Sequence, residues 1–256
     1  MSDPFASSRL KLSRAKKDLA KLKRQAVIAV GKQTYEMLAE AHPDKPDLVV
    51  YKMRLAKDLP DTISEIAGHV VDNLRSALDH VMYGVAVASG CAKPLNAYFP
   101  FSKDASTFES NLKGRCADVP REIWPLLRTY KPYKGGENLL FALNEVCTAN
   151  KHKLIIPVGS VTIAAGVSAA GIGFMSMPYP RPVWNSVKNE MELFTLHRSG
   201  TSQFKCNFQF GVYIAFGEVG ITSGKSAIPI LDEFVSMVET ILREIEAESK
   251  RLGIIN

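Results

Sequence analysis

The sequence has little cysteine and lacks the spacings that would give its cysteines a structural role. Its 256 residues contain four cysteines, at positions 91, 116, 147 and 206, and none forms a Cys-x-x-Cys pair. Structural zinc sites and compact disulfide frameworks depend on such pairs or on a much higher share of cysteine. We therefore expect reduced thiols, no disulfide and no structural zinc.

Long apolar runs are also missing. The first 20 residues are strongly charged, and the apolar run from Leu154 to Met177 is interrupted by glycine, serine and proline. A membrane span needs about 20 consecutive apolar residues, and a signal peptide needs an apolar stretch close to the start of the chain. These absences predict a soluble cytoplasmic protein without a membrane partner.

The basic charge is concentrated in the first part of the chain. The net charge is +6, and residues 1–33 hold nine Lys or Arg against Asp3 and Asp18. The same segment carries an apolar stripe at three-four spacing, which predicts a basic helix within residues 1–41. Its stripe consists of Leu12, Ala15, Leu19, Leu22, Ala26 and Ala29. The charge fits either a solvated face or a polyanionic partner, and a predicted acidic helix over 226–252 could pack against it with complementary charge.

The middle of the chain is predicted to be mostly helical. Two prolines in His42–Asp47 break the secondary structure, and alternation over 48–59 predicts a strand with one wet face. Helical periodicity then covers a segment from about 62 to 89. Shorter helices fit 105–113, 120–130 and 137–150, and Tyr98–Phe101 is interpreted as an apolar plug in the core.

Beyond Lys153 the period changes to two, which predicts strands. These strands cover 154–164, 171–177, 189–198 and 204–218. Because no long helix separates them, we expect them to form an antiparallel sheet of about five strands together with 48–59. The expected fold is a single α+β domain over 1–256, a helical layer on that sheet. Its parts are the helix of 1–41, the strand and helical core of 48–153, the strands of 154–218 and the helix of 226–252.

An unusual polar stripe runs along the helix between residues 62 and 89. Its members fall within an arc of roughly 120°. They are His69, Asp72, Asn73, Ser76, Asp79, His80 and Tyr83, opposite an apolar side of Val70, Val71, Leu74, Leu78, Val81, Met82 and Val85. Short polar side chains of this kind bond to specific partners, in contrast to the Lys and Glu of ordinary surface helices. The stripe is either a structural polar network or the wall of an active site.

A second polar group lies at the end of the helix predicted for 137–150. Glu145 and His152 share a face if the helix continues to Lys153. Asn150, Lys151 and Lys153 stand beside that histidine, and cations at a helix exit also simply favour the helix dipole. In a functional interpretation Lys151 and Lys153 bind phosphate, while Glu145, Asn150 and His152 support the stripe.

These residues carry two resemblances to known protein families. Arg75-Ser-Ala-Leu-Asp-His80 resembles the Arg-x4-6-His motif of the HEPN superfamily, whose members are toxins, defence effectors and RNA-processing enzymes. The phrase Asn73–His80, the Phe99–Phe101 cluster, the turn at 131–134 and Asn150–Lys153 together resemble a family of uncharacterised bacterial proteins. This second likeness covers about residues 48–160.

HEPN similarity implies metal-independent RNA cleavage that needs no cofactor. His80 would then be the general base or acid, and Arg75 would hold the scissile phosphate. HEPN sites are usually shared across a homodimer, so the resemblance implies a homo-oligomer with RNA as partner. On a regular helix Arg75 and His80 point about 140° apart, so a bend or a second chain would have to complete the site.

Other chemistries fit less well. The segment Gly220–Ser226 resembles a phosphate loop but has three residues between its glycines where the motif needs four. No Glu-x-x-His pair suggests a metal site among the stripe residues. Two functions therefore stay open: a HEPN-like RNA-binding or RNA-cleaving protein in defence or toxin biology, and a non-catalytic interaction or oligomeric scaffold protein. A basic cleft shared by Arg75 and His80 would favour the first, and a sealed stripe would favour the second.

Overall fold

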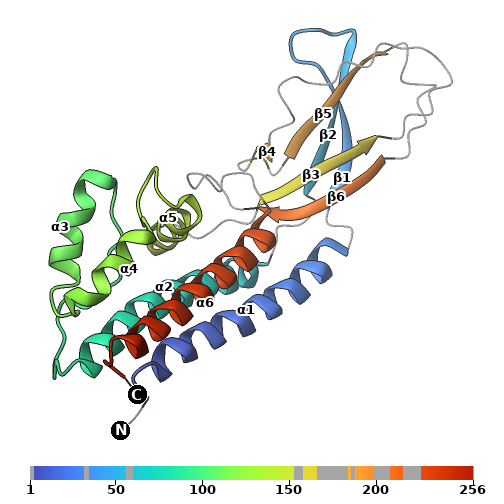
Figure 1. Ribbon diagram of the computed structural model, residues 1–256. Helices are drawn as coiled ribbons and strands as arrows, with labels where there is room; N and C mark the ends of the chain where they lie inside the picture. Colours follow the sequence, from blue (N-terminus) through green and yellow to red (C-terminus); the bar gives the residue numbers. More distant parts are fainter. Residues whose placement is uncertain are drawn as a thin grey trace.

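The computed structural model describes residues 3–31, 35–55, 60–152, 158–165, 184–185, 188, 190–198, 208–215 and 226–255 (Figure 1). The helices are α1 (Ala6–Gly31), α2 (Asp61–Ala88), α3 (Ala105–Arg115), the 3-10 helix η1 (Arg121–Ile123), α4 (Trp124–Thr129), α5 (Asn138–His152) and α6 (Ala227–Arg251). The strands are β1 (Tyr35–Ala41), β2 (Leu48–Leu55), β3 (Val158–Ala165), β4 (Trp184–Asn185), β5 (Glu190–His197) and β6 (Phe208–Ala215). The chain thus combines helices and antiparallel strands, which is the expected α+β class.

The three long helices α1, α2 and α6 pack side by side (Figure 1). All seven residues of the predicted apolar side of α2 are buried, and so are five of the six stripe residues of α1, from Leu12 to Ala26. The side chain of Ala29 lies outside the described residues. Three-four spacing alone therefore identified the faces on which these helices meet, because only one side of each helix carries enough apolar area to be buried.

Ion pairs along their rims join the two terminal helices. Lys16 Nζ lies 2.7 Å from Glu239 Oε1, and Lys23 Nζ lies 2.7 Å from Asp232 Oδ1. Arg9 Nη1 adds a third pair, 2.7 Å from Glu246 Oε2. The expected packing of a basic helix against an acidic one is confirmed.

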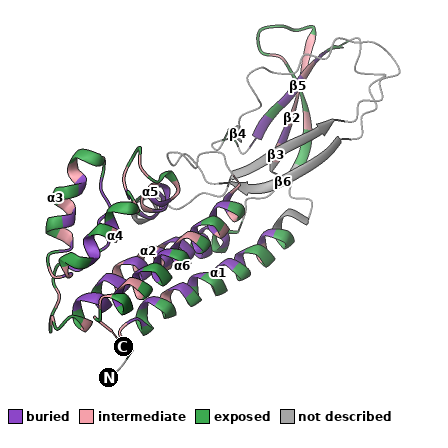
Figure 2. Cartoon of the chain, viewed as in Figure 1, coloured by how far each residue is buried: buried purple, intermediate pink, exposed green. Residues whose placement is uncertain are grey.

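The remaining helices close a second side of this helical core. In the segment 97–101, Phe99 and Phe101 are buried, and their ring centroids lie 5.0 Å apart. Figure 2 shows the buried residues along α2 and α6 and in the facing parts of α3 to α5. The apolar plug expected for Tyr98–Phe101 is therefore present in its two phenylalanines, whereas Tyr98 is 46% exposed.

The strands form two sheets, and the expectation of one sheet with about five strands is wrong. One sheet has the order β1-β2-β5-β4, in which β4 is only two residues long, and β3 pairs with β6 in a separate antiparallel ribbon. The strand expected at 171–177 lies outside the described residues. Figure 1 shows the strands gathered beyond one end of the long helices. The apolar cluster of the helical core contains no strand residue among those described.

The end of the predicted N-terminal helix is also corrected. Residues 35–41 form β1, which pairs antiparallel with β2 from Tyr35 opposite Leu55 to Ala41 opposite Val49. The sequence Tyr-Glu-Met-Leu-Ala-Glu-Ala favours a helix by intrinsic propensity. Pairing with β2 outweighs that local preference, since strand formation depends on neighbours that propensity does not include.

Candidate functional site

The polar stripe lies on one continuous helix, α2, which runs without interruption from Asp61 to Ala88. The first residue of the stripe, His69, is exposed, and its last residue, Tyr83, is 49% exposed. The five members between them are half-buried. The helix therefore carries its stripe through the packed part of the molecule.

The side chain of Arg75 is enclosed by three neighbours. Its Nε donates a hydrogen bond to Asn144 Oδ1 of α5 at 3.3 Å, and its Nη1 lies 2.6 Å from Asp79 Oδ2 in an ion pair. The guanidinium carbon stands 4.3 Å from the centre of the Phe101 ring. Only 12% of this side chain is exposed. A guanidinium can tolerate such burial because a carboxylate, an amide and an aromatic face replace its water.

Asp79 links this cation to the aromatic segment. Its Oδ2 pairs with Arg75, while its Oδ1 accepts a hydrogen bond from the backbone N–H of Phe99 at 2.9 Å. Buried N–H groups need a partner, and no regular strand or helix supplies one at this position. One carboxylate therefore fixes both the Arg75 side chain and the path of the buried Phe99 backbone.

His80 points about 140° away from Arg75 around α2 and contacts the start of α1. Its Nδ1 lies 2.6 Å from Ser7 Oγ. Burial lowers the pKa of the imidazole, the positive charge of Lys11 lowers it further, and the nearby Asp79 opposes this shift. The neutral imidazole is thus the favoured form at neutral pH.

One turn beyond His80, a glycine permits this close approach of the N-terminal segment. A Cβ placed on Gly84 would lie 2.4 Å from the carbonyl oxygen of Pro4 and 3.0 Å from the Phe5 ring. The absence of a side chain at Gly84 therefore lets Phe5 reach the core and brings Ser7 to His80.

The first residues of the stripe join α2 to both neighbouring helices. Cys147 Sγ of α5 lies 3.3 Å from Asp72 Oδ1, and Asn73 Nδ2 lies 3.5 Å from Asp18 Oδ2 of α1. The expected meeting of the stripe with the 145–153 segment is thus observed for Asp72. Asp79 and His80 instead contact Phe99 and Ser7, which are distant in sequence from that segment.

The second predicted group is only partly within the described residues. Glu145 is exposed and lines a pocket beside Asp72. The backbone of 150–152 completes α5, but the side chains of Asn150, Lys151 and His152 lie outside the described residues, as does Lys153 altogether. The phosphate-binding role expected for Lys151 and Lys153 stays a prediction.

Two pockets flank the stripe, each with a volume of about 680 Å³. The Arg75 pocket lies between α2, α5 and the segment 98–115, whereas the His80 pocket lies between α2, residues 3–7 and residues 94–98. Ser76, Asp79 and Tyr98 line both. Arg75 and His80 thus open into different pockets, as the angle between them on a straight helix predicts.

Sequence reasoning missed several contributors to these pockets. Ser7, Asn144 and Arg115 are single polar residues in segments whose periodicity gave no signal beyond a helix. Asn144 stands one residue before the expected Glu145, and this position beside a predicted site residue is its one sequence signal. Ser7 and Arg115 carry no comparable sequence signal.

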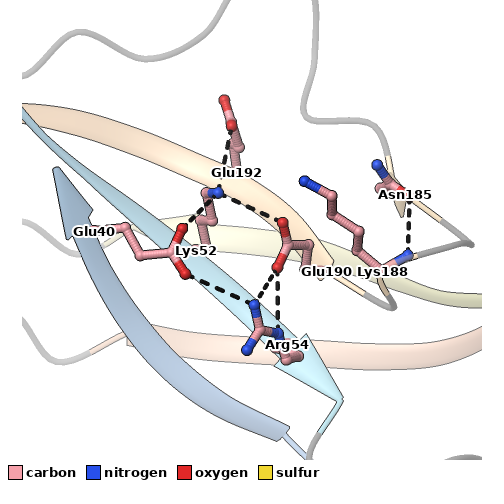
Figure 3. A network of polar contacts seen from close by, with 7 residues as sticks. All are labelled: Glu40, Lys52, Arg54, Asn185, Lys188, Glu190 and Glu192. Carbon is pink, nitrogen blue, oxygen red and sulfur yellow. Dashed lines mark hydrogen bonds and ion pairs between the residues drawn. The ribbon is translucent and has the colours of Figure 1, made fainter. Parts of the chain in front are cut away.

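A second polar cluster lies on the sheet, away from both pockets (Figure 3). Glu190 of β5 is 7% exposed, and its two carboxylate oxygens receive Lys52 Nζ at 3.4 Å and Arg54 Nη2 at 2.7 Å. Glu40 of β1 lies 2.8 Å from the same lysine and 3.7 Å from the same arginine. The hydrogen bond from Arg54 holds the pKa of Glu190 below its ordinary value, and Lys52 lowers it further. The cluster cross-links three neighbouring strands.

Within the described part of the chain, no group of three His, Cys, Asp or Glu side chains is placed to hold a metal ion. None of the described helices combines the length and apolar character needed to cross a membrane. Comparisons with protein-family models, with curated proteins and with solved structures each found no match to this chain. The geometry of the two pockets and their polar contacts is therefore the basis for assigning a function.

Proposed function

We propose that this chain is a non-catalytic interaction protein that assembles with copies of itself, with the α2 stripe as its structural network. The observation that carries the proposal is the environment of Arg75. Its charge is matched by Asp79 at 2.6 Å, and its Nε is bonded to Asn144. A catalytic arginine must offer its charge and its donors to a phosphate, whereas the charge of Arg75 is paired with a carboxylate of the same chain and its Nε is bonded to an amide of that chain.

The distribution of basic charge supports the same conclusion. Lys16 and Lys23 of the basic helix α1 are paired with acidic side chains of α6. Nucleic-acid affinity depends on cations that are free to replace counterions along the phosphate backbone. Pairing within the chain reduces the number of such cations on α1.

Exposed apolar side chains on α1 support self-association. Val27 is 72% exposed and Ile28 is 56% exposed, so two neighbouring apolar side chains of this helix face solvent. We expect a dimer or larger assembly by light scattering coupled to gel filtration, which Ile28→Glu should convert to monomer. A monomeric wild-type chain at high concentration would contradict the oligomeric part of the proposal.

The catalytic part is tested with RNA. Wild-type protein and His80→Ala are incubated with mixed RNA in EDTA, and the products are separated on a denaturing gel. We expect neither protein to cleave the RNA above the buffer control. Cleavage by the wild type that disappears in His80→Ala would overturn the non-catalytic proposal.

The second candidate is a HEPN-like RNA-binding or metal-independent RNA-cleaving protein, and the state of His80 favours it. The imidazole is held at Nδ1 by Ser7 and has a lowered pKa, so it is neutral and ready to accept a proton near pH 7. Its arginine would come from a second copy. Under this candidate Arg75→Gln and His80→Ala are each inactive, and mixing them restores part of the cleavage. Two inactive variants that stay inactive when mixed would exclude a shared site.

A further inference from the structure

The Arg75 pocket has a cationic side that the structural network does not use. The segment 98–115 contributes the cations Lys103 and Arg115 to its lining. Across the pocket, α2 and α5 contribute the carboxylates of Asp72 and Glu145. Arg75 and Asp79 also line it, but they neutralise each other. The pocket is therefore bipolar, with positive charge on one side and negative charge on the other.

Arg115 is the unusual member of this lining. Its Nε is buried and has no hydrogen-bond partner, and no ion pair involves Arg115 or Lys103 among the residues that the structure describes. A buried donor without an acceptor is destabilising, and more so when it is charged. Nη1 of Arg75 in the same pocket also makes no hydrogen bond, but it lies 2.6 Å from the carboxylate of Asp79 in an ion pair, a partner that Arg115 does not have among the described residues. An anion in the pocket would supply the acceptor that Arg115 lacks.

The backbone holds Arg115 and its aromatic neighbour in place. The backbone N–H of Tyr98 donates to the Arg115 carbonyl at 2.9 Å, and the guanidinium carbon lies 5.7 Å from the centre of the Tyr98 ring. Cys116 Sγ, directly after Arg115, lies 3.1 Å from the Tyr98 carbonyl oxygen. Tyr98, which is 46% exposed, lines the pocket beside Arg115. A cation next to an aromatic ring is a suitable binding surface for a charged planar ligand.

We propose that the Arg75 pocket binds a small phosphorylated molecule with a flat ring, of the chemical class of the mononucleotides. Its phosphate is received by Arg115 and Lys103, because a guanidinium fork matches phosphate oxygens and the ammonium adds a second charge. Its ring lies against Tyr98, and ring amino groups donate toward the carboxylate side of Glu145. The volume of about 680 Å³ lies within the range of small-molecule sites. This ligand does not depend on whether the chain is a scaffold or a nuclease.

Calorimetric titration of the full chain with AMP tests the proposal, with adenosine and inorganic phosphate as separate probes. We expect saturable binding of AMP, weaker binding of inorganic phosphate and little binding of adenosine. Arg115→Gln should weaken AMP binding by about 10-fold or more, the effect of losing a charge-assisted hydrogen bond. The matched control is Lys113→Gln, which removes the same charge from an exposed position of α3 outside the pocket lining and should change affinity by less than about twofold.

A second variant guards against a folding defect in Arg115→Gln. Arg115→Lys keeps the charge and most of the packing, so it should fold like the wild type and lose part of the AMP affinity. Absence of AMP binding by the wild type would overturn the proposal, as would equal losses in Arg115→Gln and Lys113→Gln. If adenosine bound as tightly as AMP, the phosphate would contribute nothing to affinity, and the proposed phosphate contacts of Arg115 and Lys103 would be wrong. If RNA bound to the chain and AMP did not, the ligand of the pocket would be a nucleic acid and the mononucleotide proposal would be wrong.

Discussion

The helical core and the sheet both enclose charged side chains, but they match those charges differently. In the helical core, Arg75 has one carboxylate, Asp79, and that carboxylate also holds the Phe99 backbone. In the sheet, Lys52 and Arg54 each reach both Glu40 and Glu190. The first arrangement is a single link between distant segments, and the second is a redundant cluster across neighbouring strands.

This difference shows what each cluster contributes to the fold. Loss of a single link leaves a buried charge without its carboxylate and a buried N–H without its acceptor, which is among the costliest changes in a protein. A redundant cluster can lose one member while the others remain paired. We therefore expect charge removal to be more damaging in the helical core than in the sheet, although Glu190 is more buried than Asp79.

The largest effect is expected for Asp79→Ala. Removal of the carboxylate takes the ion-pair partner from Arg75 and the hydrogen-bond acceptor from the N–H of Phe99. We therefore expect the free energy of unfolding to fall by about 3 kcal/mol. Urea unfolding followed by far-ultraviolet circular dichroism measures this loss. Asp118→Ala is the control, because Asp118 also accepts from backbone N–H groups of this segment, those of Leu95 and Asn96 at 2.7 Å, but is bound to no cation among the described residues. Equal losses in the two variants would show that Asp79 acts only as a backbone acceptor.

A smaller effect is expected for Glu190→Gln in the sheet. Glu40 still neutralises Lys52 and Arg54 in this variant, so we expect at most about half of the Asp79→Ala loss. The double variant Glu40→Gln/Glu190→Gln should lose more than the sum of the single variants, because only then does Arg54 lose both of its carboxylates while Lys52 keeps only Glu192 at 3.9 Å. Additive losses in this double-mutant cycle, measured by urea unfolding, would contradict the redundancy.

The same comparison explains which parts of the fold could be predicted. The buried faces of α1 and α2 follow from three-four spacing, because the apolar residues of a helix that packs on one side repeat with the helical period. The choice of partner strand leaves no such periodic pattern in the sequence. The sequence predicted strands near β3, β5 and β6, but nothing in their spacing shows that, among the described strands, β3 and β6 form a sheet separate from β5. The helix formers in β1 gave the opposite local signal.

The candidate site was predicted in part for a related reason. Short polar residues on α2 indicated that specific partners exist, and Asp72, Asp79 and His80 do have them. The identity of the partners was missed where it depends on tertiary structure, as for the N–H of Phe99 and the hydroxyl of Ser7. Glu190 was also missed, because a glutamate at the start of a strand normally faces water.

An intermediate effect of about 1–2 kcal/mol is expected for Gly84→Ala. The new methyl group meets the carbonyl oxygen of Pro4, so the N-terminal segment must shift, and this cost exceeds the gain of about 1 kcal/mol in helix propensity. Gly114→Ala in α3 is the control, because nothing lies within 4 Å of its added Cβ. It should be neutral or stabilising. A stability gain in both variants, measured by thermal unfolding, would show that residues 4–7 contribute little to the helical core.

The smallest predicted effect is a difference in the pH dependence of stability between the helical core, through His80, and the sheet, through Glu190. Burial and Lys11 lower the pKa of His80 in the folded chain, so between its folded pKa and its ordinary value of 6.5 the unfolded chain binds more protons. Its contribution to stability is complete above pH 6.5 and is lost as the pH falls through that window. Arg54 lowers the pKa of Glu190 from 4.5, so the sheet loses its corresponding contribution only at more acidic pH. His80→Gln should therefore flatten the decline in melting temperature just below pH 6.5, whereas Glu190→Gln should leave that decline unchanged. A decline of equal slope in wild type and His80→Gln would place the titrating group elsewhere.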